Sequence, residues 1–325
     1  LRNLPPLPPQ AGPKFRDRRF LRLTPSRIPH GPVLPDPVVQ SSPGSLSAPA
    51  TSQNFEGISS AAQAGTIGWV VPPDTNGDIG PNHYVQAVNV TFAVYDRSGA
   101  QLYGPAAINT VWQGFGGACE TSNDGDPIVL YDHLDDRWLI SQLAIPNFPD
   151  GPFYQCIAVS ETGDPLGNYH RYAFIISDSR LNDYPKLGVW PDGYYLSVNQ
   201  FLCVDLFPPF GYYDCQWEGP RVAAFERAKM LQGLPDARMV AFDLPPSNLG
   251  GLLPSGLNGL SLPAGTPNVF AQVDDGQWFN PPVPDRLQLW EFHVDWTTPS
   301  NSTFGPSLPS QPDVSVTTLA TAPFD

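Results

Sequence analysis

Three aspartates in similar sequence surroundings are the residues whose type and spacing could do chemistry. Asp78, Asp126 and Asp183 each stand, by the repeat pattern of the chain, at the start of a strand in three successive repeats. Two carboxyl groups about 5–9.5 Å apart can cleave a glycosidic bond, one as general acid and the other as nucleophile or base. The alternative is that each Asp caps a turn or bonds to backbone amides between repeats, and recurs only because the fold recurs. The turn-like flanking sequence favours this alternative.

A second group of oxygen-bearing residues suggests a cation. In "DTNGD" (74–78), Asp74, Asn76 and Asp78 alternate, and Gly77 permits a sharp turn, as at the start of a calcium loop. The Glu that completes an EF-hand is missing, since Val85 stands in its place. We therefore predict a simpler Ca²⁺ loop, with "SNDGD" (122–126) as a weaker second candidate and an Asx-turn as the alternative for both.

Aromatic and Asn residues allow two further hypotheses about glycans. The aromatic side chains alternate along predicted strands, which indicates packing between sheets, with a sugar-stacking platform as the alternative. They are Trp138, Trp190, Tyr194, Tyr195, Trp290 and Trp296. Asn89 and Asn301 begin the patterns "NVT" and "NST" and are candidates for N-glycosylation.

Composition limits the elements that can position these residues. The chain of 325 residues holds 40 Pro and 29 Gly, yet 41% of it is hydrophobic and 8 residues are Trp, which argues for packed structure without long helices. Only "FERAKMLQG" (225–233) has a helical pattern. The net charge of −14 makes nucleic acid an unsuitable partner, and no stretch reaches the roughly 18–20 apolar residues of a membrane span.

A recurring unit fills residues 65–325. Each of four copies has an acidic residue, an apolar strand, a tight turn with Asp or Gly, and an aromatic alternating strand, followed by one or two outer strands. Four-stranded β-repeats of this kind predict the blades of a β-propeller. Four blades are few for a closed ring, so we expect other segments to complete it.

Residues 1–50 form a different region. They hold 12 Pro and a charge balance of +5, against −19 for the remaining residues. Pro-rich backbone cannot build its own sheet, so we predict an extended arm, joined by a linker at 51–64. Within it, "FRDRRFLRLTPSRI" has a period-two stretch that could add a strand to an open sheet edge. The residues expected to dock are Phe15, Arg18, Arg19, Phe20, Leu21, Leu23 and Ile28.

Four cysteines suit two disulfides. Cys203 and Cys215 bracket a Pro-turn loop that a bridge would close, which leaves Cys119 to pair with Cys156. Four reduced structural cysteines are the alternative. Disulfides indicate a secreted or cell-surface protein. Because the chain begins with Leu, we expect a mature form whose leader has been removed.

The strings "DTNGDIGPNHYVQAVN", "NDGDPIVLYDHLDDRWLISQ", "DYPKLGVWPDGYYLSVN" and "DRLQLWEFHVDW" carry a resemblance. The chain resembles secreted bacterial β-propeller proteins of largely uncharacterised function, some of which are subunits of extracellular fibrils. The resemblance covers residues 65–325 and implies a structural subunit whose partners are other copies of itself. A glycoside hydrolase and a carbohydrate-binding propeller are the alternatives.

Overall fold

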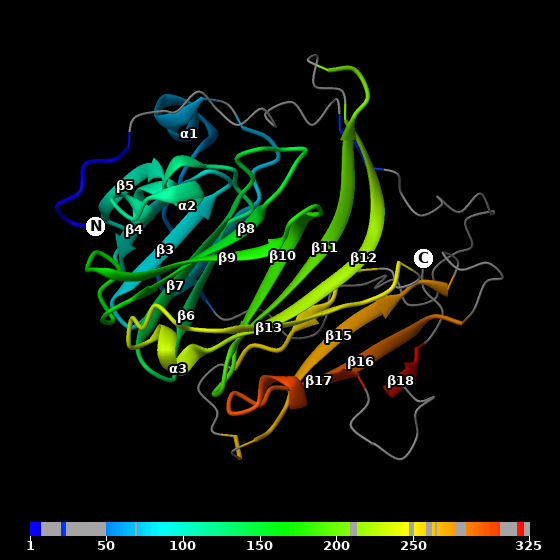
Figure 1. Ribbon diagram of the computed structural model, residues 1–325. Helices are drawn as coiled ribbons and strands as arrows, with labels where there is room; N and C mark the ends of the chain where they lie inside the picture. The colour runs from blue at the N-terminus through cyan, green and yellow to red at the C-terminus, as the bar shows by residue number, and fades with distance from the viewer. Residues whose placement is uncertain are drawn as a thin grey trace.

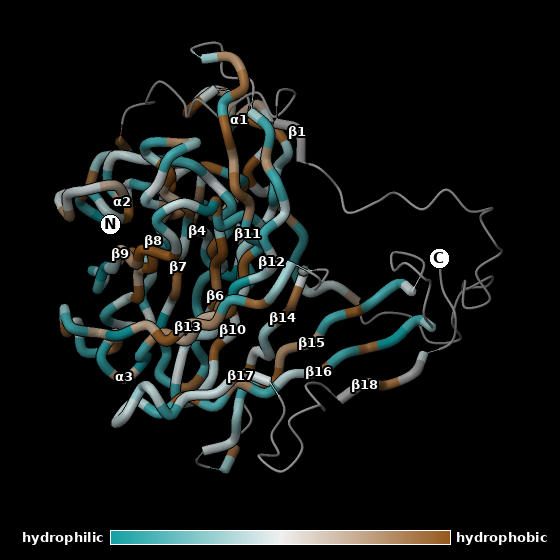
Figure 2. The backbone as a smooth tube through the Cα atoms, turned by 45° about the vertical axis from the view of Figure 1, so that its right-hand side comes forward, coloured by the Kyte–Doolittle hydropathy of each residue, from teal (hydrophilic) through white to brown (hydrophobic). Residues whose placement is uncertain are grey.

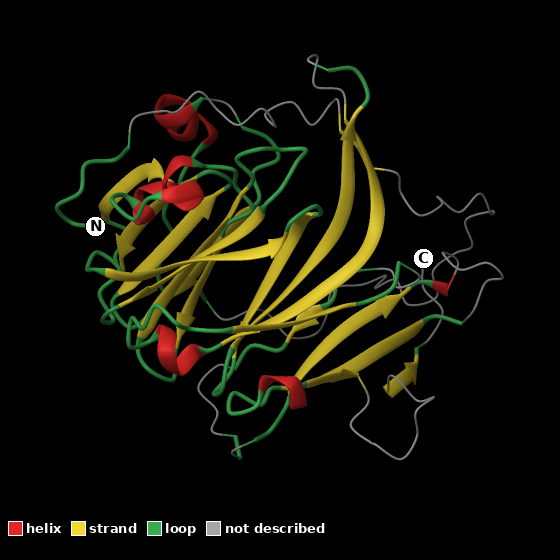
Figure 3. Ribbon diagram, in the orientation of Figure 1, coloured by secondary structure: helices red, strands yellow, loops and turns green. Residues whose placement is uncertain are grey.

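The computed structural model describes residues 1–7, 21–23, 50–68, 70–208, 213–246, 250–257, 262–263, 265–276, 284–305 and 317–321. Strands dominate these residues and the helices are short (Figure 3). The longest described helix, α1, has eight residues. In this part of the chain, no helix has the length and apolar character needed to cross a membrane. The prediction of an all-β body is confirmed.

The strands form four antiparallel sheets, each built from consecutive strands. The first two sheets contain β2 (Thr75–Ile79), β3 (His83–Val88), β4 (Thr91–Asp96) and β5 (Gln101–Ala107), then β6 (Ile128–Asp132), β7 (Arg137–Ala144), β8 (Phe153–Ser160) and β9 (Tyr169–Ser177). The other two contain β10 (Leu181–Val189), β11 (Tyr194–Asp205), β12 (Tyr213–Phe225) and β13 (Met239–Asp243), then β14 (Leu253–Pro254), β15 (Asn268–Asp274), β16 (Arg286–His293) and β17 (Thr303–Gly305). Two further strands, β1 (Leu21–Leu23) and β18 (Thr317–Ala320), pair with β12 and β16.

The four sheets follow one another as the blades of a β-propeller. Their first strands pack side by side, β2 against β6, β6 against β10, and β10 against β14. In Figure 1 the colours pass from cyan in the first sheet, through green, to orange in the fourth. Among the described elements, no comparable packing joins the fourth sheet to the first. The propeller fold predicted from the repeats is confirmed, with four blades in an open arc.

Three apolar cores lie between neighbouring blades. Successive residues of β7 point to opposite faces of the sheet, so Trp138 and Ile140 pack in the core with the first blade, whereas Leu139 packs with the third. In β11, Tyr194 packs against the second blade and Tyr195 against the fourth. In Figure 2, brown segments along β6, β7 and β8 mark the hydrophobic residues of these strands. Both faces of the central sheets are therefore buried.

Much of the segment predicted as a linker, 51–64, packs on the first blade. α1 (Ser60–Ile67) begins where the Ser59 hydroxyl accepts a hydrogen bond from Ala62 N at 3.1 Å, and it ends at Gly68. Before it, the buried Ile58 donates its N–H to Gln86 Oε1 at 2.7 Å. Contacts with the first blade therefore hold Ile58 and α1 in place.

Short helices join the strands elsewhere. The 3₁₀ helices η2 (Ile108–Trp112) and η4 (Pro299–Asn301) and the α-helix α2 (Gly117–Thr121) were not predicted. The predicted helix at 225–233 is present as α3 (Arg227–Met230).

Both predicted disulfides are present. Cys119 of α2 is bonded to Cys156 of β8, and Cys203 of β11 to Cys215 of β12. Cys203 and Cys215 are register partners in adjacent strands. The second bridge therefore ties the two strands of one hairpin together, where Cys203 and Cys215 pack with Phe153 of the second blade.

A buried ion pair fixes the second blade to the third. Asp132, at the end of β6, is fully buried, and its carboxylate accepts bonds from Arg227 Nε at 2.8 Å and Arg227 Nη2 at 2.9 Å. The Tyr194 hydroxyl donates to the same carboxylate at 2.8 Å. Although burial disfavours the charge, the bonds to Asp132 raise the pKa of Arg227. The guanidinium of Arg227 therefore stays charged, and its two bonds to the carboxylate of Asp132 offset the cost of burying it.

Replacing Arg227 by Met should destabilise the protein by about 3–5 kcal/mol, because the carboxylate of Asp132 would stay buried without its counter-charge. Urea unfolding measured side by side with the wild type checks this value. Lys229→Ala is the matched control on the same helix. Its partner Asp236 is exposed and its second partner, Glu226, keeps the closer Arg238, so we expect a change below about 1 kcal/mol. Equal effects for both variants would contradict the assignment.

Candidate functional site

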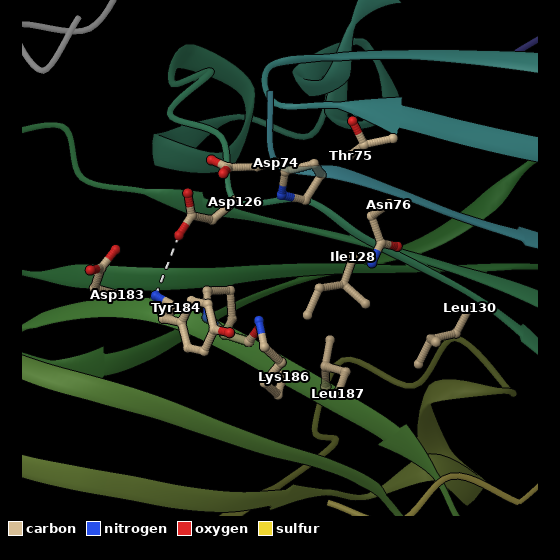
Figure 4. A pocket seen from close by; sticks show the side chains of 12 residues that line it. Asp74, Thr75, Asn76, Asp126, Ile128, Leu130, Asp183, Tyr184, Lys186 and Leu187 are labelled. Atoms are coloured by element: carbon tan, nitrogen blue, oxygen red, sulfur yellow. Dashed lines mark hydrogen bonds between the residues drawn. The ribbon is translucent and has the colours of Figure 1, made fainter. Parts of the chain in front are cut away.

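One pocket lies where the first strands of three blades begin, and we call it the strand-start pocket (Figure 4). Its volume is about 310 Å³. Polar and charged side chains from three blades line it together with apolar ones. The lining residues are Asp74, Thr75, Asn76, Asp126, Pro127, Ile128, Leu130, Asp183, Tyr184, Pro185, Lys186 and Leu187.

Local backbone conformation brings the carboxylates to this pocket. Asp74, Asp126 and Tyr184 have positive φ values of 39°, 48° and 54°. Asp adopts this left-handed region more readily than most residues, and it turns the chain into the strand that follows. In β10 the register shifts between Asp183 and Lys186, which marks a β-bulge that reorients these side chains.

The pocket combines three carboxylates with one ammonium group. Asp126 Oδ2 accepts a bond from Tyr184 N at 3.3 Å, and Asp74 Oδ2 accepts one from Asn89 Nδ2 at 3.0 Å. Lys186 Nζ lies 3.4 Å from the centre of the Tyr184 ring and donates to Pro185 O at 3.2 Å. Burial lowers the pKa of Lys186, against the attraction of the surrounding aspartates. The arrangement suits a ligand rich in hydroxyl groups.

The predicted carboxylate trio was wrong in one member. Asp126 and Asp183 do line one pocket, but Asp78 does not, and Asp74 takes its place. Asp78 Oδ2 accepts a bond from Tyr131 N of the second blade at 2.7 Å, and Oδ1 accepts one from Ile79 N at 2.7 Å. Asp78 therefore joins two blades through backbone amides, as the turn-capping alternative supposed.

Aligning the hairpin turns would have identified Asp74. The first strands of the three blades end at Ile79, Asp132 and Val189. Asp74 lies 79 − 74 = 5 residues before its strand end, whereas Asp126 and Asp183 each lie 6 before theirs, 132 − 126 and 189 − 183. Counting residues back from the hairpin turn therefore identifies equivalent positions in the blades better than the flanking motif does. Strand pairing starts at the turn, and it fixes the register from there.

The oxygen-bearing residues of "DTNGD" follow a strand more than a loop. Asn76 and Asp78 lie in β2, and Asn76 Oδ1 accepts a bond from Val129 N at 2.7 Å. Asn76 and Asp78 therefore both hold the second blade, while Asp74 lines the pocket. Among the described residues, no group of three or more His, Cys, Asp or Glu side chains is arranged to hold a metal ion. The Ca²⁺ loop stays a prediction.

The structure tests whether the aromatic residues of the strands could form a sugar-stacking platform. Trp138, Tyr194 and Tyr195 are fully buried and Trp190 and Trp290 nearly so, which rules these five out as a sugar-stacking platform. Trp296, partly exposed, donates its indole N–H to Asp192 O at 2.7 Å. These aromatic residues pack the blades.

Of the two glycosylation candidates, Asn89 is wrong. Its side chain is 4% exposed, and its amide nitrogen donates to Pro72 O at 2.7 Å and to Asp74 Oδ2. A glycan on that nitrogen would replace one of its two hydrogens, break at least one of these bonds and need room at a buried position. Asn301 is exposed at the end of η4 and stays a prediction.

The predicted assembly arm is described only in part. Phe15, Arg18, Arg19, Phe20 and Ile28 lie outside the described residues, and of Leu21 and Leu23 the backbone alone is described. That backbone forms β1, which pairs in parallel with β12, Leu21 with Tyr213 and Leu23 with Cys215. A strand is thus present within the segment expected to add to a sheet edge.

The "SNDGD" loop contains a carboxyl group in an unusual setting. Asp124 Oδ2 accepts a bond from Ile145 N at 2.7 Å. Burial of the carboxyl group raises the pKa of Asp124 to about 6, although part of the residue reaches solvent, and its hydrogen bonds only partly oppose this effect. Side-chain bonds from Asn123 to Val90 O hold the same loop on the first blade. The loop is therefore a connection between blades.

No family model and no curated protein matches the sequence. Among solved structures, an ACO/RPE65 chimera is 12% identical with a TM-score of 0.38, over 71% of this chain and 47% of that one. A thermostable family-43 glycoside hydrolase is 11% identical (TM-score 0.35; 73% and 72%), and the endo-1,5-α-L-arabinanase of Thermotoga petrophila RKU-1 is 14% identical (0.34; 69% and 51%). The match spans about half the length of the first and third of these chains. Likeness this distant does not inform the chemistry of this chain.

Stability should depend on pH through Asp124. Its pKa is raised in the folded state, so its protonated form favours folding, and stability should fall as the pH rises from about 4 through about 6. Asp124→Asn removes the charge and keeps an oxygen acceptor for Ile145 N. Allowing for partial exposure, we expect this variant to be about 1–2 kcal/mol more stable than wild type at pH 7 and no more stable at pH 3.5.

Urea unfolding at a series of pH values measures this difference. Asp150→Asn, at an exposed position, is the control, and it should leave the pH profile unchanged. A difference between Asp124→Asn and wild type that is the same at pH 3.5 and pH 7 would show that the carboxyl is not the cause.

Proposed function

We propose that this protein is a structural subunit of an extracellular filament, in which the N-terminal arm of one copy docks on the propeller of the next. The observation that carries the proposal is the parallel pairing of β1 with the outer edge of β12. Addition of a strand to an exposed sheet edge supplies affinity through main-chain hydrogen bonds. The arm is thus a segment that binds a propeller surface.

The edge that receives β1 is open because the strands of the third blade differ in length. β12 has 13 residues, but β13 pairs only with Arg221–Phe225. The other half of β12 extends past β13, and there Tyr213–Cys215 pairs with β1. The Cys203–Cys215 disulfide braces this part of the hairpin. An edge that the strands of its own blade leave open is a site for pairing with a further strand.

Exposed apolar side chains on the same hairpin support an interface. Leu202 and Val204 alternate with the buried Cys203 along β11, and they are 42% and 47% exposed. Leu206 and Phe207 continue this apolar surface at the tip. Figure 1 shows β11 and β12 rising together beyond the other strands. Contiguous apolar surface of this kind is typical of contacts between proteins.

Charge supports docking of the arm on the body. Residues 1–50 carry a balance of +5 and the remaining residues −19. Opposite charge speeds the encounter of the two surfaces and favours their correct orientation. If the arm binds the next copy rather than its own, each contact is heterologous and the chain of contacts grows into a fibre. Two disulfides suit an oxidising, extracellular setting.

A second candidate function is the binding or hydrolysis of a glycan in the strand-start pocket. Three carboxylates, an ammonium group and the Tyr184 ring offer hydrogen-bonding groups and an apolar face to a sugar. Ca²⁺ is the other ligand that carboxylates suit, but the ammonium group of Lys186 competes with a cation there. A neutral, hydroxyl-rich ligand therefore fits this pocket better.

Proline substitutions in β1 should abolish filaments. In a parallel pair, every second N–H group faces the partner strand, so either Arg22 or Leu23 donates to β12. Proline has no N–H, and Arg22→Pro together with Leu23→Pro therefore removes that donor. We expect wild-type protein to form filaments in negative-stain electron microscopy and this double variant to stay monomeric with an unchanged melting temperature. Arg22→Ala with Leu23→Ala keeps both N–H groups and should still assemble. Filaments of the proline variant, or a wild-type protein that stays monomeric at high concentration, would refute the filament role.

If the protein binds or hydrolyses a glycan, substitutions in the strand-start pocket should lower that activity, and substitutions outside it should not. Asp126→Asn and Asp183→Asn should each lower binding or hydrolysis of a polysaccharide at least about tenfold, since each removes a charged hydrogen-bond acceptor. Screening of wild type on a glycan array and on soluble polysaccharides comes first. Asp78→Asn, outside the pocket, is the control that leaves ligand binding unchanged. A silent array and no released sugar would remove this candidate.

A further inference from the structure

Residues 1–7 lie in a groove that the first two blades form, far along the chain from the residues they contact. Leu1 N donates to Gly167 O at 2.9 Å, and Arg2 N donates to Leu166 O at 2.9 Å. Arg2 Nη2 bonds to Asp164 Oδ2 at 2.7 Å. These contacts join the start of the arm to the loop between β8 and β9 of the second blade.

The first blade holds the other side of the same segment. The Tyr103 hydroxyl donates to Leu4 O at 3.3 Å, and Leu7 N donates to Thr110 Oγ1 at 3.2 Å. Leu1 is 8% exposed and belongs to the apolar core between the two blades, against which Leu4 also packs. We call the receiving residues, Tyr103, Thr110, Asp164, Leu166, Gly167 and Tyr169, the N-terminal cradle. A cavity of about 570 Å³ lies beside the seated segment, lined by Leu1–Leu4 together with Leu166, Gly167 and Tyr169.

This set of contacts has the character of peptide recognition. Main-chain groups of the segment are bonded at four points, one Leu side chain is buried as an anchor, and one Arg side chain meets a carboxylate. Such contacts depend on the segment itself and on no covalent link to the cradle. The same segment from another copy can therefore make every one of them.

Two separate sites on one propeller thus receive one arm. Leu1–Leu7 occupies the cradle on the first and second blades, and β1 occupies the edge of β12 on the third. Between β1 and the body, residues 24–49 include seven Pro among 26 residues. Fully extended at about 3.1 Å per residue, such a chain can span on the order of 80 Å, more than the diameter of about 50 Å expected of a globule this size.

We propose that in the filament the cradle holds Leu1–Leu7 of a neighbouring copy, so that the whole arm is exchanged and clamps its neighbour at two points. This inference rests on the proposed filament and adds its second binding site and the chemistry of its occupant. The occupant is an extended peptide with Leu as its anchor and Arg as its charged contact. Exchange keeps every contact and adds none, as in domain swapping. Only residues 24–49, which join β1 to the body, have to cross from one copy to the next.

Charge reversal across the Arg2–Asp164 pair tests whether the contact joins two chains. Arg2→Asp alone and Asp164→Arg alone each place like charges together, and we expect each to raise the critical concentration for filament assembly about fivefold. In an equal mixture, alternating copies restore an opposite-charge pair at every contact. The mixture should therefore assemble at a lower concentration than either variant alone, in filaments where the two variants alternate.

The Arg2→Asp/Asp164→Arg double variant is the reference for the mixture. Asp164 Oδ1 also accepts a bond from Leu166 N at 2.9 Å, and the double variant carries the loss of this bond with the charges matched. Recovery by the double variant without recovery by the mixture would place the contact within one chain and overturn the inference. Unchanged assembly in both single variants would overturn it as well. Wild-type protein without filaments would overturn the filament role and this inference together.

A competition experiment tests the same site with the wild-type protein. The peptide Leu-Arg-Asn-Leu-Pro-Pro-Leu, added at millimolar concentration to match a tethered arm, should shorten filaments by occupying the cradle. A peptide with Asp in place of Leu1 and Arg2 is the control and should have no effect. Equal filament lengths with both peptides would contradict the proposal, while loss of filaments with the first alone supports it.

Discussion

Burial of both faces of the central sheets is the constraint on which the rest of this structure depends. A strand presents alternate side chains to opposite faces, so one apolar stretch supplies two different cores. Trp138 and Ile140 pack towards the first blade and Leu139 towards the third, and Tyr194 and Tyr195 divide in the same way. A shift of one residue in register would exchange these two sets and spoil both cores. Register is thus fixed in every blade, and with it the place of each turn and each polar side chain.

Polar side chains of the first strands are used mainly to join the blades. Asn76 and Asp78 reach from β2 to the backbone amides of β6, and Asp132 reaches Arg227 across the second and third blades. Buried carboxylates need such partners, because an unpaired charge away from water is strongly unfavourable. Asp74, Asp126 and Asp183 differ from these because they stand where the strands begin, beyond the packed cores. A pocket forms at that end, and these three carboxylates line it.

The two sites that receive the arm are an edge of the third blade and the joint between the first two blades. β12 outruns β13, so half of its edge has no partner within the blade sequence, and β1 pairs there. The cradle lies at the joint of the first and second blades, where Leu1 completes the apolar core. Both sites take up parts of an arm that cannot form a sheet of its own, since Pro lacks the donor that a strand needs. Core packing thus stabilises the propeller, whereas the edge of β12 and the N-terminal cradle supply the contacts that select the arm.

The sequence by itself determined the elements that depend on local pattern. The period-two apolar stretches predicted four blades, and the spacing of the cysteines predicted the pairing of Cys203 with Cys215 and of Cys119 with Cys156. Tertiary structure alone decided which residues meet, because equivalence between blades follows from register counted from the turns. It replaced Asp78 by Asp74 in the pocket, buried Asn89, and ordered the segment at 51–64 through α1. The burial of Asn89 and the packing of α1 depend on contacts between residues distant in the chain, which no local pattern contains.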